Sequence, residues 1–437
     1  GPPAAPPRPP LLRAPCPSGP MAVTTRAVAL DEGGSQHVLL SVCPPNAPDR
    51  LPCDICMVVD VSGSMQQEAI VKTAQEAGAP QLSVLDIVRH AVKTVVHTLR
   101  GGDRLAIVAY SDKASTVLQL TNMDDAGKSS ADEALQTLNA DGQTNLWDGL
   151  RTGLELLRSA SRAGASAALL LLTDGVPNVE PEGGHIPALQ KYRRELGSKL
   201  PGTLHTFGFG SDLDSKLLND LSCEGDGMYV FIPDAGFVGT ALVNCTANTL
   251  VTMGRNAQLT VEPREGCTIE HAYGHKADNL AALPLGSLQF GQTSDVVLRV
   301  AVPAGHSGPS VRARLKYDGP GGSETLVFAD AAAAAAGSAE ALEASAQLHR
   351  LRLVELVAEV LALAGPRGEG LEAAAKAVEA FSASLVAGEP KIEALKRDTD
   401  GQVCEAVSCQ DWFTRWGAHY LRSLARAHLT QQCNNFK

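Results

Sequence analysis

The most informative segment of this chain is Met57-Val58-Val59-Asp60-Val61-Ser62-Gly63-Ser64-Met65. Its first half has the continuous apolar character of a buried strand, and a carboxylate and two hydroxyls follow at alternate positions. Because side chains alternate in direction along an extended chain, and because Gly63 permits a sharp turn, Asp60, Ser62 and Ser64 are expected to converge beyond the strand. Oxygen atoms gathered in this way predict a site for a hard divalent cation.

Two more oxygen-bearing side chains are expected at the same place. Thr144 lies in Asp141-Gly142-Gln143-Thr144-Asn145, directly before a helical pattern, and Asp174 follows the apolar run Leu169-Leu170-Leu171-Leu172-Thr173. In an open α/β sheet, ligands bind where the carboxyl ends of the strands meet. We therefore expect Thr144 and Asp174 to complete the cation site that begins with Asp60.

From about residue 51 to residue 248, short apolar runs alternate with helical patterns. This alternation is typical of a parallel or mixed sheet that is covered by helices on both faces. The best-marked helix spans Val84 to Arg100, with Ser83 as its capping residue and Gly101 as its stop. The other expected helices are Ala131–Leu138, Leu146–Ser159, Ile186–Leu200, Asp214–Leu221 and Phe237–Thr249, and the expected strands are Asp54–Asp60, Arg104–Ser111, Ser115–Leu120, Ser166–Thr173, Thr203–Phe209 and Gly227–Ile232.

The order Asp-x-Ser-x-Ser, then Thr, then Asp resembles the metal-ion-dependent adhesion site (MIDAS) of von Willebrand factor A (VWA) domains, and every position of that motif is present. The resemblance covers Leu51 to Asn248. It implies a Rossmann-like, doubly wound α/β fold and a bound Mg²⁺ ion, with Mn²⁺ or Ca²⁺ as alternatives. It also implies the roles of the site residues: Ser62, Ser64 and Thr144 bind the metal directly, while Asp60 and Asp174 act through water or as acceptors behind them.

Neutral hydroxyl ligands cancel little of the charge of a divalent cation, so the ion keeps an affinity for an anionic oxygen. Together with the resemblance, this predicts a protein-binding module that engages an Asp or Glu carboxylate of its partner through the metal. The chain shows no nucleophile with a paired base and no G-x-S-x-G turn, which predicts a protein that is not an enzyme. The expected rim of the binding surface comprises Met65, Gln66, Gln143, Asn145, Val176 and Asn178.

The segments on either side of this domain show different sequence patterns. Two strand-like segments within residues 22–49 are too few to fold alone, so we expect them to pair with strands in residues 250–330. The result would be a β-sandwich into which the domain of residues 51–248 is inserted. Residues 338–437 are expected to form a helical region, and residues 1–20 a disordered, Pro-rich segment. The arrangement resembles eukaryotic VWA proteins with a following β-rich (Vwaint-like) segment.

Composition excludes several other classes of function. A formal net charge of -11, a pI near 5.5 and 4% aromatic residues argue against a nucleic-acid partner. No apolar run reaches the roughly 18 residues of a membrane span, and no signal peptide is recognised, so we expect a cytoplasmic protein. The ten cysteines are spread thinly, which predicts free thiols. Cys53-x-x-Cys56 lacks a second pair of ligands, which favours buried side chains over a zinc site.

A second functional class stays open at this point. Some plant proteins that resemble this architecture carry a RING, and some protist relatives carry a U-box. This chain could therefore be the substrate-recruiting scaffold of a ubiquitin ligase complex. It lacks the paired cysteine spacing of a RING of its own, so ligase activity would need another polypeptide.

Overall fold

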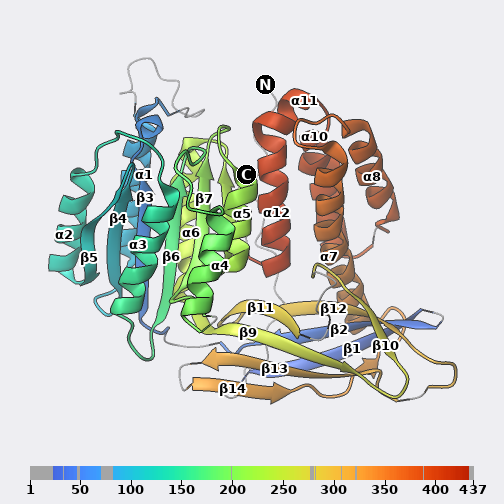
Figure 1. Ribbon diagram of the computed structural model, residues 1–437. Helices are drawn as coiled ribbons and strands as arrows, with labels where there is room; N and C mark the ends of the chain where they lie inside the picture. Colours follow the sequence, from blue (N-terminus) through green and yellow to red (C-terminus); the bar gives the residue numbers. More distant parts are fainter. Residues whose placement is uncertain are drawn as a thin grey trace.

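The computed structural model describes residues 23–32, 34–46, 50–69, 82–197, 199–275, 280, 282–306, 308–319, 322–386 and 388–432. The predicted disorder of residues 1–20 lies outside these residues. Three parts are visible: an α/β domain, a β-sandwich beneath it and a helical region beside it (Figure 1).

A six-stranded sheet in the order β5-β4-β3-β6-β7-β8 is the centre of the α/β domain. The decisive strand, β3 (Cys53–Asp60), lies inside this sheet and all of its residues are buried. Because it is covered on both faces, its sequence is continuously apolar up to Asp60. It runs parallel to both neighbours, β4 (Arg104–Tyr110) and β6 (Ser166–Thr173). The remaining strands are β5 (Ala114–Asn122), which is antiparallel to β4, and the parallel strands β7 (Thr203–Phe209) and β8 (Asp226–Ile232).

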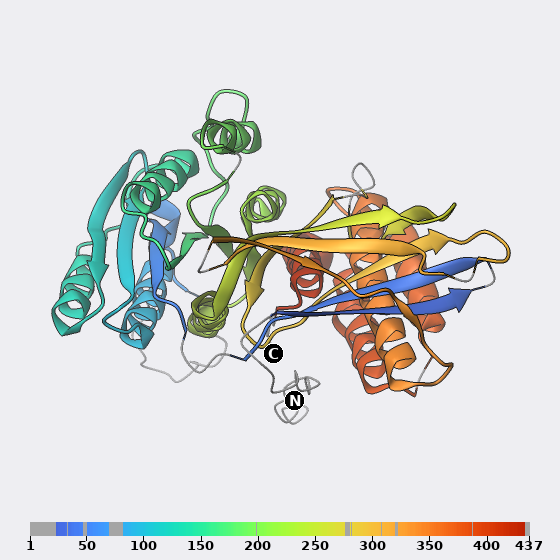
Figure 2. The same ribbon diagram turned by 90° about the horizontal axis from the view of Figure 1, so that it is seen from below.

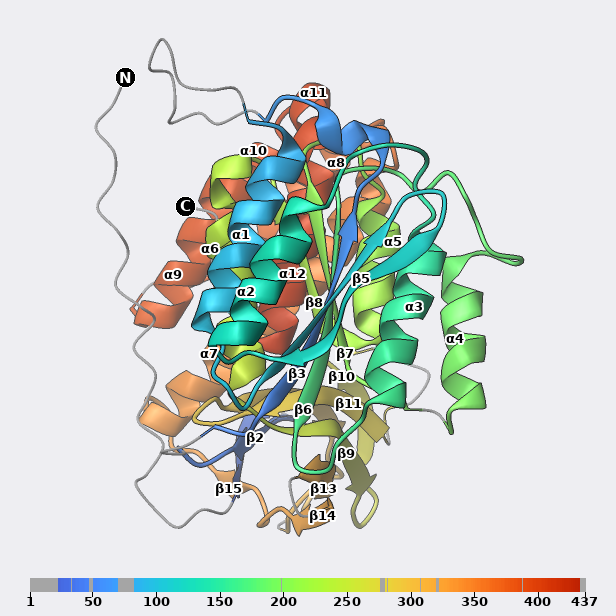
Figure 3. The same ribbon diagram turned by 90° about the vertical axis from the view of Figure 1, so that its left-hand side faces the viewer.

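Helices cover both faces of this sheet (Figure 3). Alternate residues of β3 belong to the two resulting cores: Met57 packs in the core beneath α1, and Val58 in the core beneath α3. A Cβ on Gly153 would lie 2.7 Å from a methyl carbon of Val58, so only glycine lets α3 approach the sheet this closely. One face carries α1 (Val84–Thr98), α2 (Asp125–Gln136) and α6 (Val238–Leu250), and the other carries α3 (Leu146–Ser159), α4 (His185–Glu195) and α5 (Ser215–Glu224).

Helix α2 begins six residues before its predicted start at Ala131. Asp124 caps it by accepting a hydrogen bond from the backbone N–H of Gly127 at 2.9 Å. The first turns of α2 are polar, and the prediction followed the apolar positions alone. Helix α4 likewise ends at Glu195 and not at Leu200.

The early strands β1 (Thr24–Glu32) and β2 (Ser35–Cys43) do pair with strands that follow the α/β domain. They belong to a five-stranded sheet of order β10-β12-β2-β1-β15, and a second sheet has the order β11-β9-β13-β14. In Figure 2 the two early strands run alongside the later ones. The predicted fold class, an α/β domain inserted in a β-sandwich with a helical region after it, is confirmed. The later strands are β9 (Thr252–Pro263), β10 (Thr268–Ala272), β11 (Ala282–Gln289), β12 (Ser294–Ala301), β13 (Val311–Gly319), β14 (Gly322–Val327) and β15 (Ala332–Ala333).

The five-stranded sheet is buried on both faces. Leu40 of β2 faces the second sheet and packs in one core with Leu259 and Leu315. Leu39 points the other way and packs beneath α7 with Leu348. This sheet therefore joins the sandwich to the helical region.

The helical region is more broken than the sequence predicts. The apolar positions near the end of the chain predict one helix from Trp412 to Leu429, but the helix is regular only from Ala418, because a π-helical segment, Phe413–Gly417, precedes it. Trp412 is 43% exposed, so it contributes little to the apolar face of this helix. The helices are α7 (Ala339–Ala364), α8 (Leu371–Ser384), α9 (Pro390–Asp398), α10 (Cys404–Ala406), α11 (Gln410–Trp412) and α12 (Ala418–Thr430). Within the described residues, none of the helices has both the length and the apolar character required to cross a bilayer.

Helix α12 covers the edge strand of the α/β sheet. The Ser423 hydroxyl accepts a hydrogen bond from the backbone N–H of Phe231 at 3.1 Å and donates one to the carbonyl of Tyr229 at 3.2 Å. Nearby, Arg426 donates to the carbonyl of Gly227 at 2.8 Å. An uncovered edge strand is prone to pair with other chains, so α12 protects β8 from such pairing.

We expect Ser423→Ala to lower the free energy of unfolding by about 1–3 kcal/mol, because it leaves a buried backbone N–H of β8 without an acceptor. The control is Ser130→Ala, at an exposed serine of α2 that bonds only to the carbonyl of Ala126. Urea denaturation of both variants measures the difference. Equal stabilities for the two would contradict this role of Ser423.

Candidate metal site at the carboxyl edge of the sheet

Three loops that follow neighbouring elements meet at the carboxyl edge of the sheet. Asp60 is the last residue of β3, and Ser62 precedes a 3-10 turn that spans Gly63–Gln66. Asp174 directly follows β6, the parallel neighbour of β3. Thr144 lies two residues before α3. The topology therefore brings to one edge the residues that the sequence motif singles out.

Two serines and one aspartate are directly connected by hydrogen bonds. The Ser62 and Ser64 hydroxyl oxygens lie 3.1 Å apart, and the Ser64 hydroxyl donates to Asp174 Oδ1 at 2.7 Å. Since the Ser64 proton points to the carboxylate, Ser62 is the donor in the contact between the two serines, and one lone pair of the Ser64 oxygen remains available to another group. Gly175 is close as well, because a Cβ placed there would lie 3.6 Å from Ser64 Oγ.

The loop that carries Thr144 is held against the serine loop through backbone atoms. Gly63 N–H donates to the carbonyl of Gly142 at 3.1 Å, and Asp141 N–H donates to the carbonyl of Val61 at 2.8 Å. Thr144 is buried at 5% exposure. The loop that carries Thr144 therefore lies directly against the loop that carries the two serines.

Asn178 holds Thr144 from the other side. Its side-chain oxygen accepts a hydrogen bond from Thr144 N–H at 2.8 Å, and its own N–H donates to the carbonyl of Thr144 at 3.3 Å. The loop after β6 and the loop before α3 are therefore fixed to each other. The sequence predicted Asn178 only as part of the rim.

Asp60 is completely buried and its carboxylate accepts three hydrogen bonds. The donors are Ser62 N–H at 2.8 Å, the Thr173 hydroxyl at 2.6 Å and the Tyr110 hydroxyl at 3.3 Å. Burial raises the pKa of the Asp60 carboxyl, and the hydrogen bonds from Thr173 and Ser62 oppose that rise. With its oxygens occupied in this way, Asp60 fixes the serine loop and supplies negative charge from below.

Asp174 carries the second negative charge of the site. Burial raises the pKa of its carboxyl to about 6, the hydrogen bond from Ser64 lowers it, and the charge of Asp60 raises it further. In the described part of the chain, no Lys, Arg or His forms an ion pair with either carboxylate. Hydroxyl oxygens beside two uncompensated carboxylates fit a hard divalent cation, which prefers oxygen ligands.

The predicted rim residues divide into three kinds. The prediction that Met65 belongs to the exposed rim is wrong. Its side chain is fully buried among apolar residues of α1 and β3, because the 3-10 turn points it into the core. Asn145 caps α3 by accepting from Asp148 N–H at 3.2 Å, and Asn178 positions Thr144. The side chains that are exposed at this edge without such a structural role are those of Gln66, Gln143 and Val176.

The structure does not support a metal site at the cysteine pair Cys53 and Cys56. Cys53 and Cys56 are both fully buried, and they face opposite sides of the sheet, one in each core. Burial raises the pKa of each thiol to about 12. Among the described residues, no three His, Cys, Asp or Glu side chains gather as a metal site. The buried cysteines Cys53, Cys56 and Cys245 are free thiols, as predicted.

Sequence reasoning missed two residues of the site. Thr173 and Tyr110 both donate to Asp60, and Tyr110 comes from the neighbouring strand β4. Thr173 stands directly before Asp174 at the end of an apolar run, which is a signal that could have identified it. Tyr110 could not be assigned without knowing which strand lies beside β3.

Comparison with known proteins identifies two segments of the chain. Residues 54–241 match the von Willebrand factor type A domain. Residues 389–437 match a family described as VWA / Hh protein intein-like, Vwaint. The second match covers the end of the helical region, from α9 to α12, and not the β-rich segment where the resemblance placed it.

Curated relatives are distant. An uncharacterized protein of Synechocystis sp. is 25% identical over 321 residues, which are 69% of this chain and 71% of that protein. Inter-alpha-trypsin inhibitor heavy chain H1 of Mesocricetus auratus is 26% identical over 180 residues, or 40% of this chain. The matched part spans only 18% of the heavy chain, so the two share a domain and not an overall organisation.

Two solved structures share the fold along nearly the whole chain. A von Willebrand factor type A protein from Catenulispora acidiphila aligns over 95% of this chain and 97% of its own, with a TM-score of 0.61 and 17% identity. The ArnB paralog VWA2 from Sulfolobus acidocaldarius aligns over 93% and 98%, with a TM-score of 0.53 and 16% identity. At these identities the likeness concerns the fold alone.

Without a cation, the stability of the protein should depend on the protonation of Asp174. Its pKa of about 6 lies above the value of about 4 for an unfolded chain, so folding favours the protonated carboxyl. The resulting stability is present below about pH 4 and is lost as the pH rises through 6. In EDTA at pH 7.5, Asp174→Asn should therefore raise the free energy of unfolding by about 1–3 kcal/mol.

The gain should shrink as the pH approaches 4. Denaturation curves at several pH values measure it, with Asp141→Asn, an exposed carboxylate on the adjoining loop, as the control. A gain of the same size at pH 4 and pH 7.5 would show that Asp174 is not the titrating group.

Proposed function

We propose that this chain, which belongs to the von Willebrand factor type A family through residues 54–241, is a non-catalytic protein-binding module. It holds a divalent cation at Ser62, Ser64 and Thr144 and offers that cation to a carboxylate of its partner. The observation that carries the proposal is the hydrogen-bonded series from Ser62 through Ser64 to Asp174. Domains of this type typically mediate protein–protein interaction or adhesion, which supports this class of function.

The donor set supports a cation that remains electrophilic. The proposed direct ligands are neutral hydroxyls, while the Asp60 carboxylate already accepts three hydrogen bonds. The Ser64 proton is directed at Asp174 and one lone pair of the Ser64 oxygen accepts from Ser62, so the other lone pair is left for a cation. Charge from the two carboxylates attracts the ion without cancelling it through direct bonds, and an anionic oxygen from outside is then a favourable further ligand.

Mg²⁺ is the cation that we propose, with Mn²⁺ and Ca²⁺ as alternatives. Mg²⁺ accepts few protein ligands and keeps several waters, which suits a site of three hydroxyls. Ca²⁺ takes six to eight oxygen ligands at longer distances, which is more than the proposed hydroxyls provide.

The partner contributes an Asp or Glu side chain. The partner residues beside that carboxylate contact a rim with both polar and apolar side chains. Gln66 and Gln143 offer amide groups, and Val176 offers an apolar surface that is 56% exposed. A carboxylate flanked by a small apolar residue would match both. Asn145 and Asn178 support this surface from beneath, through the bonds described above.

The remaining sequence predictions keep the status of proposals. The module spans residues 51–248, within a sandwich of residues 22–49 and 250–330 and beside a helical region of residues 338–437. Free thiols suit the reducing cytoplasm, where we place the protein. The alternative of a ubiquitin ligase scaffold finds no support in the family matches or in the relatives described above.

Isothermal titration calorimetry with Mg²⁺ and with Mn²⁺ tests the cation site. Wild-type protein should bind one ion, and Ser64→Ala and Asp60→Asn should each reduce the affinity at least tenfold, which corresponds to about 1.4 kcal/mol. Ser111→Ala is the matched control, since it removes a serine hydroxyl at the end of the adjacent strand β4. Equal affinities for Ser64→Ala and Ser111→Ala would sink the assignment.

Capture of partners from lysate tests the second half of the proposal. Wild-type protein in Mg²⁺ should retain a partner that is lost in EDTA and with Thr144→Ala, because both changes remove the ion that the carboxylate binds. Circular dichroism should show Thr144→Ala to be folded. Replacing the acidic residues of the captured partner by Asn or Gln then locates the ligand. Retention that is unchanged in EDTA would contradict the mechanism.

A further inference from the structure

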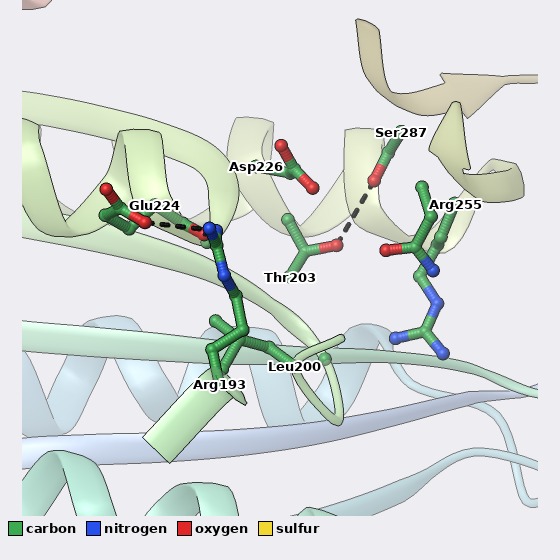
Figure 4. A pocket seen from close by; sticks show the side chains of 10 residues that line it. Arg193, Leu200, Thr203, Glu224, Asp226, Arg255 and Ser287 are labelled. Carbon is green, nitrogen blue, oxygen red and sulfur yellow. Dashed lines mark hydrogen bonds and ion pairs between the residues drawn. The ribbon is translucent and has the colours of Figure 1, made fainter. Parts of the chain in front are cut away.

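A second polar site lies at the opposite edge of the α/β sheet, where the domain meets the β-sandwich. A small cavity, partly open to solvent, lies here at the amino ends of β7 and β8. Its polar lining comes from both parts of the molecule (Figure 4): Arg193, Thr203, Glu224 and Asp226 from the α/β domain, and Arg255 and Ser287 from the sandwich.

We call this cavity, with the lining residues given above, the seam pocket, and Asp226 is its unusual residue. Its φ angle is 55°, a left-handed conformation that is uncommon for residues other than glycine. Burial raises the pKa of its carboxyl. Among the described residues, its carboxylate accepts no hydrogen bond and forms no ion pair. A half-buried carboxylate without a partner is costly to keep and points to a missing ligand.

Arg255 supplies the opposite charge. Its guanidinium donates one hydrogen bond, to the carbonyl of Pro201 at 3.1 Å, and burial lowers its pKa. Within the described part of the chain it forms no ion pair. Asp318, the carboxylate that most raises the pKa of Arg255, is itself paired with Lys199 at 2.6 Å. Most of the hydrogen-bonding capacity of Arg255 is therefore unused.

The other charges of the pocket are already satisfied. Arg193 pairs with Glu224 at 3.0 Å, and Glu224 also accepts from Gln190 at 2.8 Å. Two hydroxyls, those of Thr203 and Ser287, lie 3.2 Å apart and stand between Asp226 and Arg255 in Figure 4. The pocket thus offers one unpaired negative group, one unpaired positive group and neutral hydrogen-bonding groups between them.

We propose that the seam pocket binds a small zwitterion of the α-amino-acid class. The ammonium group of the ligand pairs with Asp226, its carboxylate pairs with Arg255, and the hydroxyls of Thr203 and Ser287 bond the polar atoms between. A lone cation would leave Arg255 unpaired, and a lone anion would leave Asp226 unpaired. Because the lining comes from both parts of the molecule, the bound ligand stabilises their junction.

Titration of the full chain with glycine, L-alanine and L-serine by calorimetry tests the proposal, with melting temperature as a second readout. Wild-type protein should give saturable heats with at least one of them, and the same ligand should raise the melting temperature. Methylammonium and acetate, which carry one charge each, should bind at least tenfold more weakly. Since amino acids at high concentration also stabilise proteins by exclusion from their surface, the calorimetric saturation is the deciding observation.

Asp226→Asn is the main variant, because asparagine has a similar volume, tolerates the left-handed conformation and removes only the charge. It should lower the affinity at least tenfold, and Arg255→Gln should do the same by removing the other charge. Asp220→Asn, at an exposed carboxylate on α5, should bind as the wild type does. Absence of saturable binding to wild-type protein, or equal binding by Asp226→Asn, overturns the proposal. Should one variant fail to fold, the other variant and the wild-type titration still decide.

Discussion

The carboxylate of Asp60 is the fixed point on which the candidate site depends. It stands at the end of a strand without solvent exposure, so it must find its hydrogen-bond donors inside the protein. The three donors come from the serine loop, from β4 and from β6. One buried charge therefore sets the relative positions of two strands and the loop that follows β3, and the hydroxyls that the cation would need are placed as a consequence.

The surrounding architecture makes that edge rigid. One continuous apolar core runs from Tyr229 and Phe231 of β8 to Leu421 of α12 and Val357 of α7. Gln431, just after α12, links this helix to the sandwich. Its side-chain oxygen accepts from Asp295 N–H at 2.6 Å, and its side-chain nitrogen donates to the Asp295 carboxylate at 2.8 Å. The helical region thus contacts both the α/β domain and the sandwich and holds them together. The two polar sites lie at opposite edges of one sheet, so each can be tested without altering the other.

Local signals in the sequence were enough for much of this structure. Helix α3 has the predicted bounds, because Asn145 marks its start and its apolar positions recur with helical period. The decisive strand and the convergence of Ser62 and Ser64 with Asp174 also follow from alternation and strand order. Strand β10 carries no such local signal, since Thr268–Ala272 holds only two apolar residues and pairs with a distant strand.

What the sequence could not provide were the contacts between distant segments. The direction of the Met65 side chain depends on a 3-10 turn whose burial no local pattern reveals. Three examples join residues far apart in the chain. They are the hydrogen bond from Tyr110 to Asp60, the hydrogen bond from the backbone of β8 to Ser423, and the charged lining of the seam pocket. Such pairings are determined by the packing of whole elements and appear only in the folded structure.

Anomalous diffraction from crystals grown with Mn²⁺ would locate the cation independently of any partner. We expect one strong anomalous peak at the carboxyl edge of the sheet, within bonding distance of the hydroxyl oxygens of Ser62, Ser64 and Thr144. A peak elsewhere on the molecule, or an empty edge at saturating Mn²⁺, would contradict this expectation.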